Sequence, residues 1–254
     1  MPTLQGSTAI VTGGGRGLGL AMARALAESG AGIGLLDILP DVSETAAALG
    51  RDTGVATAGV IADVRDSAAV ESAVGALQQQ LGTADILVTS AGITIWGESA
   101  EVSPEDWQRV LDINLNGTFF AAQSFSRRLL QEKKPGSIIF VSSMSGRIVN
   151  VPQFQASYNS SKAAVSMLAK SLAVEWAPVG IRVNALEPGY TLSDMTAQFM
   201  DANPELAAQW TSMIPMRRMG EPSDLVGAVV YLASPESSYL TGQSIVIDGG
   251  YTAV

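Results

Sequence analysis

The chain of 254 residues contains no histidine and no cysteine. Without histidine, neither a Ser-His-Asp nor a Cys-His arrangement for nucleophilic catalysis is available. The usual zinc ligands are also missing, although a Mg²⁺ or Ca²⁺ site built from oxygen atoms is still open. Disulfide bonds are excluded, and with them a secreted scaffold that depends on disulfides. If the protein is an enzyme, its proton transfers must use Asp, Glu, Lys, Tyr or water.

Basic residues and long apolar runs are also scarce. Lys and Arg number 15 against 24 Asp and Glu, which gives a net charge of −9. This balance argues against a general nucleic-acid binder and against attraction to anionic lipid. The start of the chain lacks the pattern of a signal peptide, and no apolar run approaches the roughly 18 residues of a membrane span. We therefore expect a cytoplasmic protein that binds neither nucleic acid nor membranes.

Short apolar segments alternate with helical patterns along the whole chain. Strands are predicted at residues 7–12, 32–37, 55–62, 85–89, 136–142, 181–186 and 243–247. Helices are predicted at 17–29, 41–49, 67–81, 104–132, 156–177 and 221–233, and a helical segment interrupted by Pro204 at 194–212. This order predicts an α/β fold, a Rossmann-type doubly wound parallel sheet of about seven strands with helices on both faces. We expect a single domain over residues 1–254, with a loop excursion at about 190–215 near the substrate.

A glycine-rich turn, TGGGRGLG at residues 12–19, joins the first predicted strand directly to the first helix. Glycines allow a tight turn and a close approach to a pyrophosphate, and the helix N-terminus offers free N–H groups. An ordinary glycine-rich turn is the alternative. Because the motif lies between a strand and a helix at the start of an α/β chain, it favours a dinucleotide site.

Tyr158 and Lys162 lie four residues apart in a predicted helix, so both side chains lie on one face. A free tyrosine titrates near pH 10 and is a poor base at neutral pH, but a neighbouring ammonium group stabilises the phenolate and should lower its pKa. Such a pair is common in helices and indicates chemistry only in context. Part of that context is Ser143, which follows the fifth predicted strand, since ligand sites of α/β proteins lie at the carboxyl ends of strands.

Several motifs together resemble the short-chain dehydrogenase/reductase family, and the resemblance covers essentially the whole chain. The motifs are T-G-x-x-x-G-x-G with Gly13, Gly17 and Gly19, Ser143 followed 15 residues later by Tyr158-x-x-x-Lys162, and N-x-x-x-P-G ending at Pro188 and Gly189. The loop after Ser143 is most similar to that of polyol dehydrogenases of the galactitol, sorbitol and arabinitol type. The resemblance implies hydride transfer between a nicotinamide cofactor and a secondary alcohol or ketone.

The resemblance also implies the catalytic roles. Tyr158 would exchange the proton of the alcohol, with Lys162 beside it, and Ser143 would hold the substrate oxygen. Asn114 matches a family residue that perturbs its helix and supports a water leading to the lysine. Ser142 and Ser145 compete with Ser143 for its role, whereas the family alignment favours Ser143 and assigns Ser145 to the substrate pocket.

The cofactor preference depends on two residues with opposite effects. Asp37 ends the second predicted strand, where a carboxylate accepts hydrogen bonds from ribose hydroxyls and repels a 2′-phosphate. Arg16 matches a position where a basic residue often helps to bind NADP. We predict that the cofactor is NAD, with NADP as the alternative. The alternative role for Asp37 is that of a turn or helix-capping residue. The predicted cofactor positions are Gly13, Arg16, Gly17, Leu18, Gly19, Asp37, Asp63, Val64, Ser90, Ala91, Gly92, Tyr158, Lys162, Pro188, Gly189, Thr191 and Ser193.

One segment departs from the family pattern. The family usually has Asn-Asn-Ala-Gly after the fourth strand, and this chain has Thr89-Ser90-Ala91-Gly92. Hydroxyls replace two amides, so a structural hydrogen bond to the neighbouring strand is expected to be weaker or rearranged. Ala91 and Gly92 keep the small size that a close approach of the cofactor needs.

The polar residues Ser145, Asn150, Gln153 and Tyr190 are candidates for contacts with several substrate hydroxyls, or they satisfy loop backbone instead. Trp96, Met195, Phe199 and Trp210 are candidates for an apolar wall, which would equally suit an aromatic or acyl ketone. We therefore predict an NAD-dependent polyol dehydrogenase. An NADPH-dependent 3-oxoacyl or carbonyl reductase and a non-catalytic nucleotide-binding sensor are the alternatives. The resemblance implies a homotetramer, and because no cluster of acidic residues is evident we expect no metal.

Overall fold

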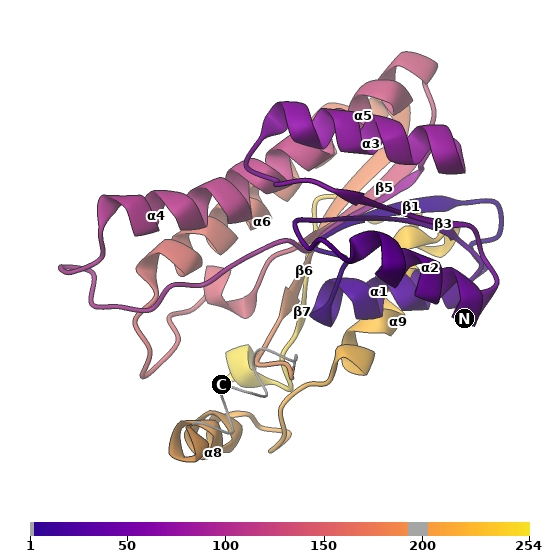
Figure 1. The fold of residues 1–254 in the computed structure, drawn as a ribbon. Helices are drawn as coiled ribbons and strands as arrows, with labels where there is room; N and C mark the ends of the chain where they lie inside the picture. The colour runs from indigo at the N-terminus through magenta and orange to yellow at the C-terminus, as the bar shows by residue number, and fades with distance from the viewer. Residues whose placement is uncertain (1–2, 193–202) are drawn as a thin grey trace.

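A seven-stranded parallel sheet forms the centre of the computed structural model, which describes residues 3–192 and 203–254 (Figure 1). In chain order the strands are β1 (Thr8–Thr12), β2 (Gly32–Asp37), β3 (Thr57–Ile61), β4 (Ile86–Thr89), β5 (Gly136–Val141), β6 (Ile181–Pro188) and β7 (Ser244–Ile247). Their order across the sheet is β3-β2-β1-β4-β5-β6-β7. The chain runs outward from β1 to β3 and then returns to β4, so the direction switches between β1 and β4, where ligand crevices form in such folds.

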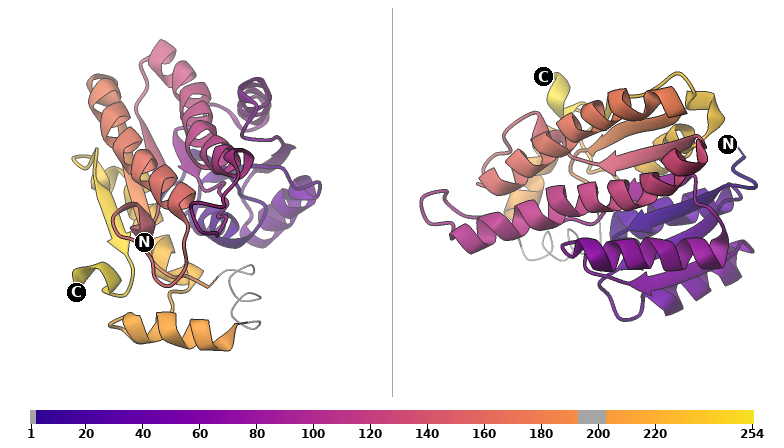
Figure 2. Two further views of the ribbon diagram at one scale, coloured as in Figure 1. Left: turned by 90° about the vertical axis from the view of Figure 1, so that its left-hand side faces the viewer. Right: turned by 90° about the horizontal axis from the view of Figure 1, so that it is seen from above.

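Helices cover both faces of this sheet, as predicted (Figures 1 and 2). One face carries α3 (Ser67–Leu81), α5 (Gly117–Glu132) and α6 (Ala156–Trp176), and α4 (Pro104–Leu111) extends from α5. The other face carries α1 (Gly17–Glu28), α2 (Val42–Thr53) and α9 (Pro222–Ala233). Each layer has its own apolar core, with Phe125 and Val165 buried on the first face and Met22 and Val229 on the second. The strands are thus covered on both faces, which explains their nearly continuous apolar sequences.

One predicted helix end was wrong by several residues. The prediction ended the second helix at Leu49, before Gly50, but α2 continues to Thr53 and ends at Gly54, which has a φ of +75°. Gly50 lies inside the helix because a Cβ there would lie only 2.5 Å from Thr57 Oγ1 on β3. The segment predicted to be interrupted at Pro204 is described only from residue 203, and there Pro204 begins α8 (Pro204–Met213), a position where its missing N–H is harmless. The preceding part of that predicted segment, residues 194–202, lies outside the described residues.

The long helical region predicted at 104–132 contains one irregular turn. A π-helical turn, η1 (Asp112–Asn116), separates α4 from α5. Asn114 lies in this turn and is fully buried. At the start of α5, a Cβ on Gly117 would lie 2.7 Å from Val64 Cγ2, so the glycine lets this helix pack closely on the segment after β3. A π-turn inside a helix is often found at a functional site.

The glycine-rich turn after β1 packs directly on the end of β4. Gly13 has a φ of +64°, and a Cβ on it would lie 2.6 Å from the Ala91 nitrogen. A Cβ on Gly19 would lie 2.0 Å from the Gly13 carbonyl oxygen. Glycine is therefore required at both positions by the local packing. Within the described part of the chain, no helix is long and apolar enough to cross a membrane.

Candidate active site

A cleft of about 880 Å³ opens at the carboxyl ends of the strands. It is lined by nearly all of the predicted site residues, from the glycine turn at one end to the loops after β5 and β6 at the other. Those that line it are Gly13, Arg16, Gly17, Leu18, Gly19, Asp37, Asp63, Val64, Ser90, Ala91, Gly92, Ser143, Ser145, Asn150, Gln153, Tyr158, Lys162, Pro188, Gly189, Tyr190 and Thr191. Asn114 lies behind this wall, and Ser193 lies outside the described residues, as do Met195 and Phe199.

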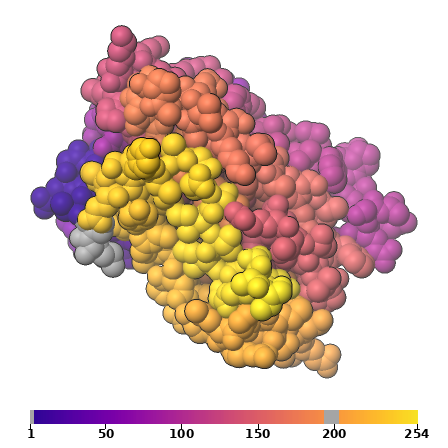
Figure 3. Space-filling model, turned by 180° about the vertical axis from the view of Figure 1, so that it is seen from behind, coloured from indigo at the N-terminus to yellow at the C-terminus, as the bar shows by residue number. Residues whose placement is uncertain are grey.

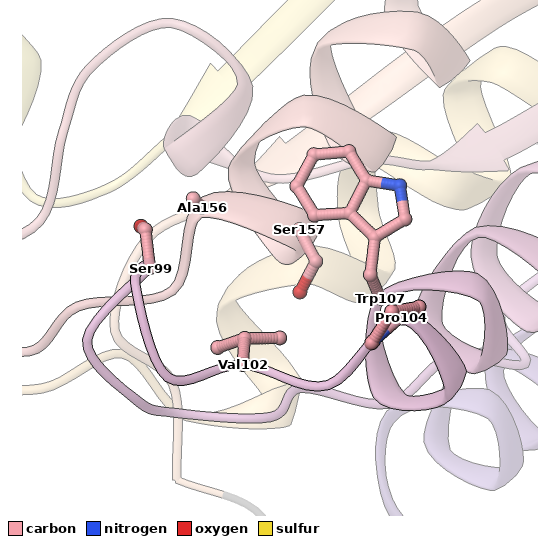
Figure 4. A pocket seen from close by; sticks show the side chains of 6 residues that line it. All are labelled: Ser99, Val102, Pro104, Trp107, Ala156 and Ser157. Atoms are coloured by element: carbon pink, nitrogen blue, oxygen red, sulfur yellow. The ribbon is translucent and has the colours of Figure 1, made fainter.

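A second, smaller pocket of about 330 Å³ lies between the starts of α4 and α6 (Figure 4). Its lining consists of Ser99, Val102, Pro104, Trp107, Ala156 and Ser157. The two serine hydroxyls and the indole N–H are the polar side-chain groups of this set, and none of its side chains titrates near neutral pH. The residues capable of proton transfer therefore belong to the larger cleft.

The first turn of α1 is suited to bind a pyrophosphate. Its N-cap residue, Arg16, makes no side-chain capping hydrogen bond, and the turn contains no acidic residue. The helices α3 and α4 differ from α1, because Asp66 caps α3 and Ser103 caps α4 through their side-chain oxygens. The free N–H groups of α1 thus face the cleft, where an anion can accept their hydrogen bonds. These groups fit a dinucleotide cofactor.

The residues that bear on cofactor choice lie at the end of the cleft that holds the glycine turn. Asp37 accepts hydrogen bonds from the backbone nitrogens of Gly15 at 2.9 Å and Leu39 at 3.2 Å. It therefore acts as a turn residue, the alternative considered above, while also lining the cleft. Asp63 forms an ion pair with Arg65 at 2.6 Å, and this guanidinium lowers the pKa of the Asp63 carboxyl. Arg16 is exposed.

Ser143, Tyr158 and Lys162 converge at the centre of the cleft. Lys162 Nζ lies 5.6 Å from the centre of the Tyr158 ring and donates a hydrogen bond to the Val141 carbonyl oxygen at 2.8 Å. Ser143 is hydrogen-bonded to the Tyr158 hydroxyl, which favours the phenolate. Ser142 points elsewhere, since its hydroxyl donates to the Lys162 carbonyl oxygen at 2.8 Å. Of the three serines considered, Ser143 is thus the one hydrogen-bonded to Tyr158.

The electrostatics of this pair differ from the sequence-based expectation. Burial lowers the pKa of Lys162 from 10.5 to about 8. Burial also raises the pKa of Tyr158, and the Ser143 hydrogen bond opposes this only in part. The expected lowering of the Tyr158 pKa by the ammonium group is therefore not found among the groups of the protein itself. The reason is that burial disfavours the charged form of each group, and Lys162 is not among the groups that shift the Tyr158 pKa.

Asn114 cross-links the elements around Lys162. Its Nδ2 donates to the Ile93 carbonyl oxygen at 2.9 Å and to Ser161 Oγ at 3.0 Å, and its Oδ1 accepts from the Ile93 nitrogen at 2.9 Å. A Cβ on Gly92 would lie 3.3 Å from Asn114 Oδ1 and 3.5 Å from Lys162 Nζ. The glycine thus lets the amide and the ammonium group lie close to the same point. Asn116 instead donates to Asp112 Oδ1 within η1.

The substitution of hydroxyls for amides after β4 has a visible consequence. The Thr89 hydroxyl is buried and has no hydrogen-bond partner among the described residues. The backbone nitrogen of Ser90 still donates to the Thr12 carbonyl oxygen at 3.0 Å, so the two strands stay paired. A threonine hydroxyl is too short to replace the hydrogen bonds of an asparagine side chain, and the missing bond to the neighbouring strand agrees with the expectation.

The substrate end of the cleft is built from interlocked polar and aromatic side chains. Tyr190 accepts hydrogen bonds at its hydroxyl from Gln153 Nε2 at 2.8 Å and Asn150 Nδ2 at 3.2 Å. Its ring stacks on Trp210 of α8 at 4.7 Å, and Trp210 Nε1 donates to Gln153 Oε1 at 3.0 Å. Trp96 meets Trp210 edge-on at 5.9 Å. Gln153 therefore uses both ends of its amide to hold the aromatic wall. Burial raises the pKa of Tyr190 to about 12, so its hydroxyl stays protonated.

Two further residues of this region, Gln155 and Tyr251, were not predicted from the sequence. Gln155 lines the cleft and donates to Asn150 Oδ1 at 3.1 Å and, more weakly, to Ser145 Oγ at 3.4 Å. Tyr251 meets the Tyr190 ring edge-on at 5.5 Å. The only sequence signal for Gln155 is its place directly before α6, the helix that carries Tyr158 and Lys162. No local pattern indicates Tyr251, because it reaches the site only through the packing of the C-terminal segment.

Comparisons with known proteins agree with this geometry. Residues 13–252 match the family model described as enoyl-(acyl carrier protein) reductase. The chain is 44% identical over 253 residues to galactitol 2-dehydrogenase (L-tagatose-forming) of Cereibacter sphaeroides, covering 98% of this chain and 96% of that protein. It is 41% identical over 253 residues to a sorbose reductase of Candida albicans, covering 98% and 88%.

A solved structure is similar over the same extent. A gluconate 5-dehydrogenase from Burkholderia cenocepacia J2315, in complex with NADP and tartrate, superposes with a TM-score of 0.93 at 34% identity, covering 99% of this chain and 97% of that one. The names of these relatives differ in substrate but share oxidation or reduction at a secondary alcohol or ketone. By the family model, the relatives and the fold, the chain belongs to the short-chain dehydrogenase/reductase family.

Proposed function

We propose that this protein is an NAD(H)-dependent dehydrogenase that interconverts a polyol and its ketose. The observation that carries the proposal is the meeting of Ser143, Tyr158 and Lys162 with a hydrogen-bonding wall in a cleft that also holds the glycine turn. The cofactor, when bound, supplies the hydride acceptor or donor. The protein supplies binding, orientation and the path of the proton.

The proton path begins at Tyr158. In alcohol oxidation its oxygen accepts the proton of the reacting hydroxyl, and Ser143 holds the same substrate oxygen in place by hydrogen bonding. Lys162, with a pKa lowered to about 8 by burial, takes up or releases a proton close to neutral pH. Asn114 fixes the helix that carries both groups through Ser161, and we assign to it the support of proton exchange between Lys162 and solvent. In ketone reduction the same protons move in the opposite direction.

The preference for NAD rests on Asp37. Two backbone N–H groups hold the Asp37 carboxylate in place. Its negative charge would repel a 2′-phosphate nearby. Arg16 favours NADP instead, as does the NADP in the similar gluconate 5-dehydrogenase structure. We weigh Asp37 more heavily because Arg16 is exposed and long enough to turn into solvent, whereas the carboxylate is 9% exposed and held in place.

The polyol assignment rests on the polar side chains opposite Tyr158. Ser145, Asn150 and Gln155 are connected by hydrogen bonds, and such a network can exchange internal partners for the hydroxyls of a linear sugar alcohol. The aromatic residues Tyr190 and Trp210 give the apolar surface on which the C–H groups of a sugar pack. The names of the relatives, galactitol 2-dehydrogenase and sorbose reductase, support the same class.

The test is to incubate the purified protein with NAD⁺ or NADP⁺ and a panel of galactitol, sorbitol and arabinitol. The absorbance of the reduced nicotinamide reports turnover, and Tyr158→Phe is the inactive control. We expect turnover of at least one polyol, with a higher kcat/KM for NAD⁺. Absence of turnover with every polyol and both cofactors would contradict the proposal. Efficient reduction of 3-oxoacyl or aromatic ketones with NADPH, without polyol activity, would favour the second candidate, which Arg16 and the aromatic wall support.

We also propose that the protein assembles as a homotetramer. On the outer side of α6, Met167 is 59% and Val174 80% exposed, and their spacing of seven residues places both on one helix face, where a second copy could cover them. On the back of the molecule, the C-terminal segment borders the residues after α8, where the Met216 nitrogen donates to the Gly249 carbonyl oxygen (Figure 3). Light scattering during gel filtration should give four times the mass of the chain, and a monomeric mass would exclude the assembly.

A further inference from the structure

A buried carboxylate that the proton path does not use lies directly behind the cleft. Glu187 is 1% exposed and lies near the end of β6, just before Pro188 and Gly189. Its Oε1 accepts a hydrogen bond from Ser166 Oγ at 2.7 Å, and its Oε2 forms an ion pair with Arg147 Nε. A buried carboxylate is stable only with such partners, because its desolvation is costly. The side chain is thus held at two points.

Glu187 lies where β5 and β6 stop pairing. The last paired residues are Val141 and Leu186. Beyond them, hydroxyl groups bridge the gap between the strands, since Ser166 Oγ lies 2.9 Å from Ser142 Oγ. Ser142 in turn donates to the Lys162 carbonyl oxygen. The carboxylate is therefore one end of a row of polar contacts that runs through the hydroxyls of Ser166 and Ser142 to the backbone of Lys162.

Lys162 is hydrogen-bonded to the end of β5 through both its side chain and its backbone. Its Nζ donates to the carbonyl oxygen of Val141, and its own carbonyl oxygen accepts from the next residue, Ser142. A change in the position or hydrogen bonding of Ser142 will therefore move Lys162 relative to the end of β5. Ser143, which follows directly, moves with the same strand end.

The charge of the carboxylate decides where the hydroxyl protons of Ser142 and Ser166 lie. Ser142 and Ser166 each have one hydroxyl proton. Ser166 donates its proton to Glu187, because a hydrogen bond to an ionised oxygen is stronger than one to a neutral oxygen. The Lys162 carbonyl oxygen, 3.2 Å from Ser166 Oγ, is then left to the proton of Ser142. The charge on Glu187 therefore sets the direction of the hydrogen bonds that support Lys162.

The ion pair with Arg147 connects the same carboxylate to the turn that carries Ser143. Arg147 follows the 3-10 turn η2 (Met144–Gly146), and its backbone nitrogen donates to the Met144 carbonyl oxygen at 2.8 Å. At the start of this turn, the Ser145 nitrogen donates to Ser143 Oγ at 3.1 Å. Glu187 thus holds both sides of the catalytic group, the turn at Ser143 and the helix at Lys162.

We propose that Glu187 is a positioning residue for the oxidoreductase reaction, acting through Ser166 and Arg147 on Lys162 and Ser143. It is absent from the lining of the cleft, so it has no contact with substrate or cofactor there. The proposal rests on the function proposed above. It predicts a loss of turnover without a loss of cofactor binding.

The test uses Glu187→Gln, Ser166→Ala and the double variant, with kcat, KM and the Kd for the cofactor measured for each. Glu187→Gln keeps the size of the side chain but removes the charge, and Ser166→Ala cuts the link to Ser142 while leaving the ion pair. We expect kcat to fall about tenfold in each single variant, because a small displacement of the reacting groups has an effect of this order. The Kd for the cofactor should stay within about twofold of the wild-type value. The double variant should be no slower than the slower single variant, since both changes break one chain.

Ser171→Ala is the matched control, because Ser171 lies on the same helix and its hydroxyl bonds only the Met167 carbonyl oxygen at 3.1 Å among the described residues. It should keep the wild-type kcat. Unchanged kcat in Glu187→Gln, or losses of kcat and cofactor binding that follow the folded fraction, would overturn the positioning role. If Glu187→Gln does not fold, Ser166→Ala alone decides. A wild-type protein without any turnover would refute the proposed function, and this role with it.

Discussion

Replacing Lys162 by Met tests whether the buried ammonium group sets the pH dependence of the reaction. Oxidation of an alcohol needs the Tyr158–Lys162 pair with one proton missing: Tyr158 accepts the proton of the alcohol either as a phenolate or while it passes its own proton toward neutral Lys162. In the wild-type protein the lower pKa of the pair is that of Lys162, about 8. In Lys162→Met only Tyr158 remains, and burial raises its pKa above the ordinary value of 10.0. The break in the pH profile should therefore move upward by about two units or more.

The size of the rate loss follows from these two values. At pH 8 about half of the wild-type pair has lost a proton, whereas less than about 1% of the variant has, so oxidation should be slower by about 50-fold or more. The assay is kcat/KM for the polyol between pH 6 and about 10.5 at saturating NAD⁺. The bound nicotinamide lowers both breaks, so the difference between the two proteins is the measured quantity. A break at the same pH in both would show that another group titrates, and would refute the argument.

Lys170→Met is the control for this variant, because Lys170 lies on the same helix with an exposed side chain. It should leave the pH profile unchanged.

The free energy of unfolding of Lys162→Met shows whether this variant folds. Burial of Lys162 lowers its pKa from 10.5 to about 8, which corresponds to a cost of about 3 kcal/mol below pH 8. Removing the hydrogen bond to Val141 costs about 1–3 kcal/mol. The variant should therefore be as stable as the wild type at pH 7 or up to about 2 kcal/mol more stable. Because the folded pKa lies below the unfolded one, wild-type stability should rise between pH 8 and 10.5 through this residue, and the variant should lack that rise.

Three further variants test the remaining assignments. Tyr158→Phe should lower kcat at least about 100-fold with unchanged cofactor binding by fluorescence titration, since it removes only the proton-transfer group; retained activity would exclude that role. Asp37→Asn should raise the ratio of kcat/KM for NADP⁺ over NAD⁺ about tenfold, because it removes the like charge but keeps an acceptor for Gly15; an unchanged ratio would mean that Asp37 acts only in the turn. Gln153→Leu should raise KM for the polyol about tenfold with an unchanged Kd for NAD⁺, since two hydrogen bonds that hold the aromatic wall are lost; an equal loss of NAD⁺ binding would count against a role at the substrate end.

The fold was largely predictable because its strands are buried on both faces and therefore appear as short apolar runs between helical patterns. The error in a helix end occurred where a residue with a strong local preference serves the packing instead. Gly50 suggested a helix end, but it lets α2 approach Thr57. The π-turn at Asn114 leaves no periodic signal, because it arises from a side chain that bonds to Ile93 and Ser161 across the fold.

The candidate site divides in the same way. Tyr158 and Lys162 could be predicted because one helix carries both, and the glycine turn because it is contiguous in sequence. Glu187 and Arg147 are 40 residues apart, and their pairing depends on the divergence of β5 and β6, which no local pattern encodes. The residues alone left Ser142, Ser143 and Ser145 as candidates to face Tyr158, and only the resemblance to the family favoured Ser143. The hydrogen bond of Ser142 to the backbone of Lys162 answers this, because it commits that hydroxyl to the helix.

The absence of histidine makes the burial of Lys162 the central electrostatic feature of the site. An imidazole titrates near neutral pH without help, whereas an ammonium group does so only when it is desolvated. The 5% exposure of Lys162 supplies that desolvation and lowers its pKa to about 8, while the Val141 carbonyl oxygen accepts one hydrogen bond from Nζ. A second acceptor at Nζ would stabilise the ammonium form further and move the pKa back toward 10.5. The single carbonyl contact, the small Gly92 beside it and the hydroxyl chain behind it therefore act together, since each keeps Lys162 buried with few partners and able to exchange a proton near neutral pH.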